Sequence, residues 1–124
     1  DNRQKIADYY FDNLKQLEDD GLLKLPKRAY DRTHTYHLFC LEMLKDNPKD
    51  VIPLLSDLGI GATLAYGYLI SDYDMLDMGE PYDSEDFPKA RLITNKLLAI
   101  PMSQYMTLEQ AEQTVKAIKE VVGC

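Results

Sequence analysis

Helix-like and strand-like segments alternate along this chain of 124 residues, and this order limits its fold more than any other feature. Apolar residues recur every three or four positions over residues 3–19, 51–58 and 107–122, a spacing typical of amphipathic helices. Asp86-Phe87-Pro88 opens one more helix that runs to about Lys96. Short apolar runs at residues 35–44, 60–66 and 97–102 predict strands, and residues 22–31 predict a connector.

The order α-β-α-β-α-β-α predicts an α/β (α+β) small sandwich, with about four helices packed on one sheet of about three strands. Residues 1–124 are expected to form a single domain, because two separate cores would each be too small. Thr107 with Gln110 three residues later predicts a capping box for the last helix. Pro53 fits only the first helical turn, so the cap of the second helix is expected near Asp50.

Acidic residues are concentrated in one segment. The chain carries a formal charge of −7, and the seven acids that produce it are Asp72, Asp74, Asp77, Glu80, Asp83, Glu85 and Asp86, with no Lys or Arg among them. A nucleic-acid binder normally presents a basic face, so we expect no nucleic-acid partner. The segment is typical of a solvated loop, and it lacks the ligand spacing of a calcium loop.

The cysteines and histidines offer no metal or catalytic set. Cys40 lies in an apolar run, where a small buried hydrophobe is expected, and Cys124 is the last residue, so the two form a poor disulfide pair. On a strand, His34 and His37 would point to opposite faces and could not chelate one ion. Cysteine usage is that of an intracellular protein, and no apolar run reaches the roughly 18 residues of a membrane span.

The sequence Gly59-Ile60-Gly61-Ala62 lacks the lysine and Ser/Thr of a phosphate loop. A helix C-cap at Gly59 and a close backbone approach at Gly61 account for both glycines without a ligand. No lysine lies in an apolar pocket that the sequence reveals, and no nucleophile–base set is apparent. The residues alone therefore give no complete active site.

Five segments, in order, resemble the C-terminal small domain of the DegT/DnrJ/EryC1/StrS family of sugar aminotransferases. Residues 3–14 resemble the family's helix "R..ia..Y...L", His34-Thr35-Tyr36-His37-Leu38-Phe39 its "hsyhly" strand, and Leu54-Leu55-Ser56-Asp57-Leu58-Gly59-Ile60 its "hLkerGI" segment. Asp86-Phe87-Pro88-Lys89-Ala90 with Leu97-Leu98-Ala99-Ile100-Pro101-Met102 resembles "dfPvae…lLsLPm", and residues 107–122 resemble the closing helix. The five segments cover nearly the whole chain.

The resemblance implies a cytoplasmic, pyridoxal phosphate (PLP)-dependent enzyme that moves an amino group from glutamate to a nucleotide-linked keto sugar. Such enzymes serve lipopolysaccharide, surface polysaccharide or deoxysugar biosynthesis, and they are usually homodimers. Their PLP lysine lies in an N-terminal large domain that is missing here. The resemblance therefore implies a chain that has no bound cofactor and no transaminase activity by itself.

The resemblance also assigns one substrate contact, Tyr66. The family often has a histidine at the positions of Ala65 and Ile70, which places recognition of a nucleotide diphosphate in question. Tyr66 could equally be a tyrosine packed at a strand end. Two further classes stay open: a ligand-sensing module with its site at Ile60-Gly61-Ala62, and an interaction module that uses the tyrosine-rich first helix.

Overall fold

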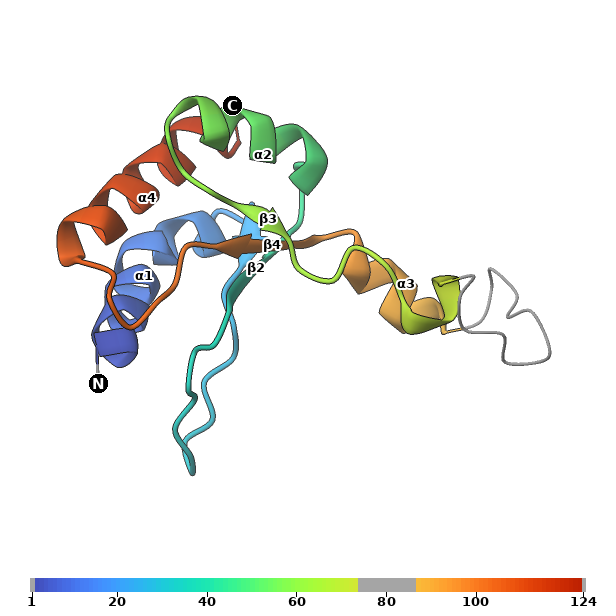
Figure 1. The fold of residues 1–124 in the computed structure, drawn as a ribbon, viewed down its shortest axis with the longest axis horizontal. Coiled ribbons are helices and arrows are strands. Elements are labelled where there is room, and N and C mark those ends of the chain that lie inside the picture. The colour runs from blue at the N-terminus through green and yellow to red at the C-terminus, as the bar shows by residue number, and fades with distance from the viewer. Residues whose placement is uncertain (1, 74–86, 124) are drawn as a thin grey trace.

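The computed structural model describes residues 2–73 and 87–123 (Figure 1). Its helices are α1 (Asn2–Asp19), α2 (Pro48–Asp57), α3 (Pro88–Thr94) and α4 (Leu108–Val121), with a short 3-10 turn, η1 (Ile70–Asp72). Its strands are β1 (Leu23–Lys24), β2 (Phe39–Met43), β3 (Thr63–Leu64) and β4 (Leu97–Ile100). The sheet has the order β1-β2-β4-β3, and each neighbouring pair is antiparallel.

The predicted α+β class is confirmed, but the described sheet has four strands instead of three. The additional strand, β1, lies inside the predicted connector, where Leu23 pairs with Met43 and Lys24 with Glu42. A strand of two residues is too short to show an alternation of apolar and polar side chains. Only its pairing with β2 therefore identifies β1 as a strand. The predicted strands at 35–44, 60–66 and 97–102 are all shorter in the structure.

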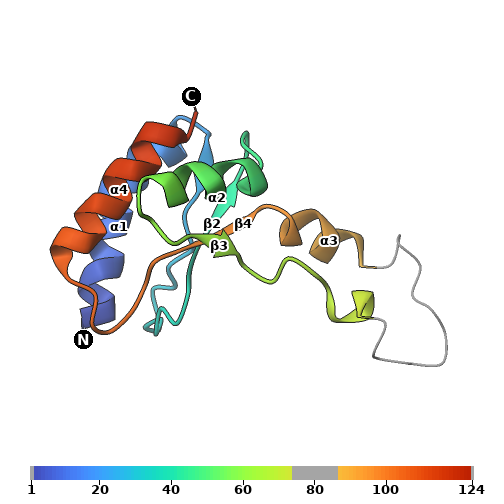
Figure 2. The same ribbon diagram turned by 45° about the horizontal axis from the view of Figure 1, so that its top comes forward.

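One face of the sheet supports the core. Along β2 the side chains of Phe39, Leu41 and Met43 are buried, whereas Cys40 and Glu42 between them are half-buried, as the two-residue period of a strand requires. The buried face contacts the apolar stripes of α1 and α4, which lie side by side, with α2 next to α4 (Figures 1 and 2). The arrangement is the helix-on-sheet layering predicted from the element order.

The helix ends confirm one predicted cap and correct another. Thr107 accepts a hydrogen bond from the Gln110 backbone at 3.2 Å, and the Gln110 side chain accepts one from the Thr107 backbone at 3.0 Å, which is the predicted capping box. The cap of α2 is Asn47, not Asp50: its side-chain oxygen accepts the Lys49 N–H at 3.0 Å. The prediction that Pro53 fits only the first turn is wrong as well: Pro53 lies inside α2, past its first turn, where its nitrogen cannot donate to Lys49 O.

Two segments extend from this body. The first is the hairpin, residues 25–38, which joins β1 to β2. The second is the arm, residues 65–73 and 87–96, which carries η1 and α3 away from the other helices (Figures 1 and 2). The acidic residues from Asp74 to Asp86 lie outside the described residues, as does Cys124. The N-cap of α3 is Phe87, not Asp86.

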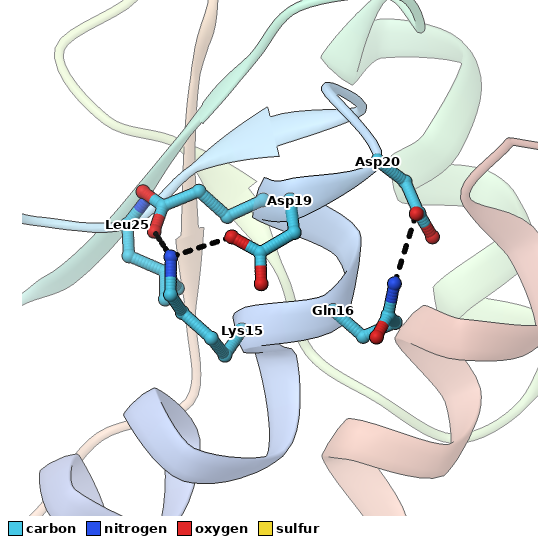
Figure 3. A network of polar contacts seen from close by, with 6 residues as sticks. Lys15, Gln16, Asp19, Asp20 and Leu25 are labelled. Carbon is cyan, nitrogen blue, oxygen red and sulfur yellow. Dashed lines mark hydrogen bonds and ion pairs between the residues drawn. The ribbon is translucent and has the colours of Figure 1, made fainter.

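The hairpin is fastened to the end of α1 (Figure 3). The Glu18 carboxylate accepts a hydrogen bond from the Leu25 N–H at 2.9 Å. It also forms an ion pair with Lys15, at a distance of 2.9 Å. The Leu25 N–H, followed by Lys15, lowers the pKa of Glu18 below its usual range.

Among residues 2–73 and 87–123, no helix is long and apolar enough to cross a membrane.

Candidate functional site

Tyr66 lies where the arm leaves the sheet. Its neighbour Ala65 is buried and donates its N–H to Leu97 O at 3.0 Å, which continues the pairing of β3 with β4 by one residue. Tyr66 itself has a φ of 53° and is 74% exposed. A left-handed conformation at a non-glycine residue costs about 1 kcal/mol or more. Here it turns the chain out of the sheet, and the ring is not packed at the strand end.

The arm presents apolar side chains to solvent. Beyond Tyr66, the large hydrophobic residues exposed on it are Tyr68, Ile70, Tyr73, Phe87, Leu92 and Ile93. Tyr68 and Tyr73 contact each other edge-to-face, with ring centroids 6.4 Å apart. Isolated exposed apolar residues are ordinary, but a group on one projection is typical of an interaction surface.

An ion pair holds the two halves of the arm together. Asp72 of η1 lies 2.8 Å from Arg91 of α3, and both side chains are about three-quarters buried. The Leu69 N–H, 3.0 Å from the Asp72 carboxylate, and the Arg91 guanidinium lower the pKa of Asp72 below its usual range. Asp72 is thus an anchor of the arm, and not simply one charge in a solvated acidic loop.

The two positions where the family often has histidine differ in their surroundings. Ala65 is 4% exposed, whereas Ile70, on η1, is 77% exposed. Both side chains are apolar. Neither side chain can donate a hydrogen bond to a phosphate. Of Ala65, Tyr66 and Ile70, Tyr66 therefore has the one polar side chain, and its hydroxyl is the group that could contact a substrate.

A groove of about 440 Å³ lies at the other end of β3, beside the glycine-containing loop. The one ionisable side chain in its lining is that of Tyr105. The lining residues are Gly59, Ile60, Gly61, Pro101, Met102, Ser103, Tyr105, Met106, Gln110, Gln113 and Thr114. The predicted end of the helix at Gly59 is confirmed: Leu58 is the C-cap, Gly59 follows it with a φ of 78°, and Ile60 N donates to Leu55 O at 2.8 Å. The predicted close approach at Gly61 is wrong, because an added Cβ would meet nothing within 4 Å.

The histidines do not lie on a strand as predicted, because β2 begins only at Phe39. His34 accepts the Tyr36 N–H on Nδ1 at 2.8 Å, and its ring lies 4.6 Å from that of Tyr36. His37 is exposed. Within the described ranges 2–73 and 87–123, no three His, Cys, Asp or Glu side chains are grouped closely enough to hold a metal ion.

Cys40 is half-buried, less than predicted, because it lies on the face of β2 opposite the core. Burial raises the pKa of the Cys40 thiol, so little of the thiolate, which is the nucleophilic form, is present at neutral pH.

The interaction surface predicted on the first helix is corrected as well. Tyr10 is fully buried against Phe39, with ring centroids 5.1 Å apart, and Tyr9 and Phe11 are partly buried against the core. The exposed aromatic residues of the described chain are concentrated on the arm instead.

Among residues 2–73 and 87–123, no lysine side chain is fully buried. A Schiff-base lysine must be desolvated so that its amine is neutral and nucleophilic. All lysines here are exposed except Lys96, which is half-buried just before β4. The described lysines therefore lack the burial that a Schiff-base lysine requires.

The fold is that of a domain found in sugar aminotransferases. It matches the crystal structure of NtdA from Bacillus subtilis with bound PMP at a TM-score of 0.85 and 22% identity, over 97% of this chain and 27% of that one. It also matches an aminotransferase from Psychrobacter cryohalolentis at a TM-score of 0.83 and 20% identity, over 97% of this chain and 33% of that one.

The profile of the DegT/DnrJ/EryC1/StrS aminotransferase family matches residues 1–119, and the chain belongs to that family. Two curated relatives are a 3-oxo-glucose-6-phosphate:glutamate aminotransferase of Bacillus subtilis, 22% identical, and a dTDP-3-amino-3,6-dideoxy-alpha-D-galactopyranose transaminase of Aneurinibacillus thermoaerophilus, 25% identical. Each match covers 94% of this chain, which spans 26% and 30% of the two relatives.

Proposed function

We propose that this chain is the C-terminal small domain of a larger, PLP-dependent nucleotide-sugar aminotransferase. In that enzyme the amino group passes from glutamate to a keto group of the sugar, for lipopolysaccharide, surface polysaccharide or deoxysugar biosynthesis. The parent acts in the cytoplasm as a homodimer. This chain is inactive alone, and its role is to close one side of the active-site cleft.

The length relationship carries this proposal. The family profile accounts for residues 1–119, yet the chain spans only 26% and 30% of the two curated relatives. A match that uses almost all of one chain and under a third of the other is expected for a single lobe. The missing lobe would supply the PLP lysine, because the lysines of this chain are exposed or half-buried.

The arm supports the same proposal. Its exposed aromatic and aliphatic side chains need a partner, and the large domain is a partner of suitable size. Since the Asp72–Arg91 ion pair fixes α3 against η1, the arm can present these side chains without further folding. Docking of the arm would bring Tyr66, at its base, to the edge of the cleft.

Tyr66 is proposed to donate its hydroxyl to the substrate. The curated relatives are named for a sugar 6-phosphate and for a dTDP-linked sugar, so a phosphate-bearing sugar is the substrate class proposed here. With alanine and isoleucine at positions 65 and 70, the cations that bind the phosphates would come from other residues.

The test compares this 124-residue chain with the product of the complete coding region that contains it. We expect PLP absorbance and glutamate-dependent amination of dTDP- or UDP-linked keto sugars only in the complete product. In that product Tyr66→Phe should raise KM about tenfold by removing one hydrogen bond to a charged group, whereas Tyr105→Phe should not. A coding region without a PLP-binding lobe, or transamination by the chain alone, would contradict the proposal.

A ligand-sensing module is the second candidate, and the groove beside Gly61 is the observation that favours it. Gly61→Val would place a side chain in open space within that groove and should abolish ligand binding there without unfolding the chain. In an aminotransferase domain, the same change should leave the KM for the sugar unaltered.

A further inference from the structure

The geometry points to a phosphate-binding site in the pocket between the hairpin and α1. The pocket has a volume of about 230 Å³ and is lined by three cationic side chains, Lys27, Arg28 and Arg32, and one carboxylate, Asp8. The lining thus has a formal charge of +2 in a chain whose charge is −7. This inference goes beyond the proposed function and does not depend on it, because the whole pocket lies in the described chain.

Arg28 is held in place before any ligand arrives. Its guanidinium carbon lies 3.9 Å from the centroid of the Phe11 ring, and its Nη2 pairs with the Asp8 carboxylate. A guanidinium has five N–H donors, so an ion pair through one nitrogen leaves others for a second acceptor. The ring and the carboxylate limit the rotamers of Arg28, which lowers the entropy cost of binding an anion.

Lys27 and Arg32 supply the remaining charge. Lys27 forms no ion pair with any residue in 2–73 or 87–123. Arg32 pairs with its neighbour Asp31 at 2.7 Å, but the two side chains are 73% and 45% exposed. Water weakens such an exposed pair, so a dianion can compete for the arginine.

His34 adds an oriented donor. Because Nδ1 accepts the Tyr36 N–H at 2.8 Å, the proton of the neutral imidazole is on Nε2, which can donate. The arrangement depends on Tyr36, a buried residue with a φ of 48°. The Gln4 side chain donates to His34 O and fastens the same turn to α1.

These groups favour phosphate over other ligands. Ammonium, guanidinium and imidazole N–H groups are all donors, and the one carboxylate of the lining is already engaged by Arg28. Three cations around one pocket match the two charges and several acceptor oxygens of a phosphate group better than the single charge of a carboxylate. The site would accept inorganic phosphate, a sugar phosphate or a nucleoside diphosphate.

The test is an NMR titration of the ¹⁵N-labelled chain with inorganic phosphate, glucose 6-phosphate and UDP at constant ionic strength, with glutamate as the carboxylate comparison. We expect saturable shifts of the amide signals of residues 27–36 and a Kd of about 1–10 mM for phosphate. The probe that binds most tightly identifies the source of the phosphate group. Glutamate should bind at least about tenfold more weakly.

Lys27→Gln combined with Arg32→Gln should weaken phosphate binding about tenfold or more, a loss of about 1.4 kcal/mol. Arg28 is kept because it packs on Phe11. The control, Lys45→Gln combined with Lys49→Gln, removes the same charge beyond the other end of β2 and should leave the Kd within about twofold. Absence of saturable shifts, equal effects of both double variants, or glutamate binding as tight as phosphate would overturn the assignment.

Discussion

The hydroxyl of Tyr10, in the middle of α1, donates to the carbonyl of Pro101 at 2.7 Å, which joins the first helix to the segment that follows β4. Tyr10 is fully buried, and its hydroxyl also lies 3.6 Å from the Met106 sulfur. A position that the helical period marks only as apolar is therefore a polar link between two distant parts of the chain.

Tyr10→Phe should lower the free energy of unfolding by about 1–2 kcal/mol, because Pro101 O loses its donor in a partly buried site. Urea denaturation at pH 7 measures the change. Tyr105→Phe, at a residue that is 83% exposed, is the control and should change stability by less than about 0.5 kcal/mol. Equal stabilities of the two variants would show that the Tyr10 bond contributes nothing.

Stability should also fall between about pH 10 and pH 12. Burial, against a smaller opposing effect of the Thr114 hydroxyl, raises the pKa of Tyr10 to about 12. The unfolded tyrosine ionises near pH 10, so above that pH the folded state holds more protons than the unfolded state, and rising pH favours unfolding. About 2–3 kcal/mol of stability is lost across this window, and Tyr10→Phe should lack that component.

The cap of α2 can be tested with a matched pair. Asn47→Ala removes the acceptor of the Lys49 N–H and should destabilise the chain by about 1 kcal/mol. Asp50→Ala removes only a favourable charge in the first turn, which contributes about 0.3–1 kcal/mol. A larger loss at Asp50 than at Asn47, measured by thermal unfolding, would restore the cap that the sequence predicted.

The two glycines of the loop after α2 should respond differently to alanine. Gly59 has a φ of 78°, so Gly59→Ala is expected to cost about 1 kcal/mol in backbone strain. Gly61 has no such φ and open space around it, and Gly61→Ala should be neutral or slightly stabilising. Denaturation midpoints of the two variants decide the matter, and equal losses would contradict it.

The arm should loosen when its ion pair is removed. Asp72→Asn weakens the link between η1 and α3, so amide exchange in residues 88–96 should accelerate while exchange in α1 and α4 stays unchanged. Asp57→Asn, at the exposed end of α2, is the control.

Because the pKa of Asp72 is lowered, the link is complete above the ordinary carboxyl range and is lost as pH falls through the folded pKa. The wild-type arm should therefore loosen at acidic pH, and the arm of Asp72→Asn should not loosen further. Equal protection of residues 88–96 in the two proteins near neutral pH would rule out this role.

The sequence by itself determined the four helices, the order of these helices and of three strands, and the family, but it missed β1. Apolar spacing and the Thr107–Gln110 capping box are local patterns, and the structure confirms α1, α4 and the capping box. The family's motifs are contiguous segments, so they too can be recognised without a fold. Asn47 followed by Pro48 was a usable signal for the α2 cap, but the prediction favoured Asp50 because of Pro53.

Only the tertiary structure decided what depends on residues far apart in the chain. β1 exists because Leu23 meets Met43, Tyr10 is a polar link because Pro101 O reaches it, and Asp72 anchors the arm because Arg91 lies beside it. The left-handed conformations of Tyr36 and Tyr66 also have no local signature, since tyrosine adopts them only where surrounding contacts compensate the strain. Periodicity records which side of an element is buried, whereas pairing between distant segments is fixed only when the chain packs.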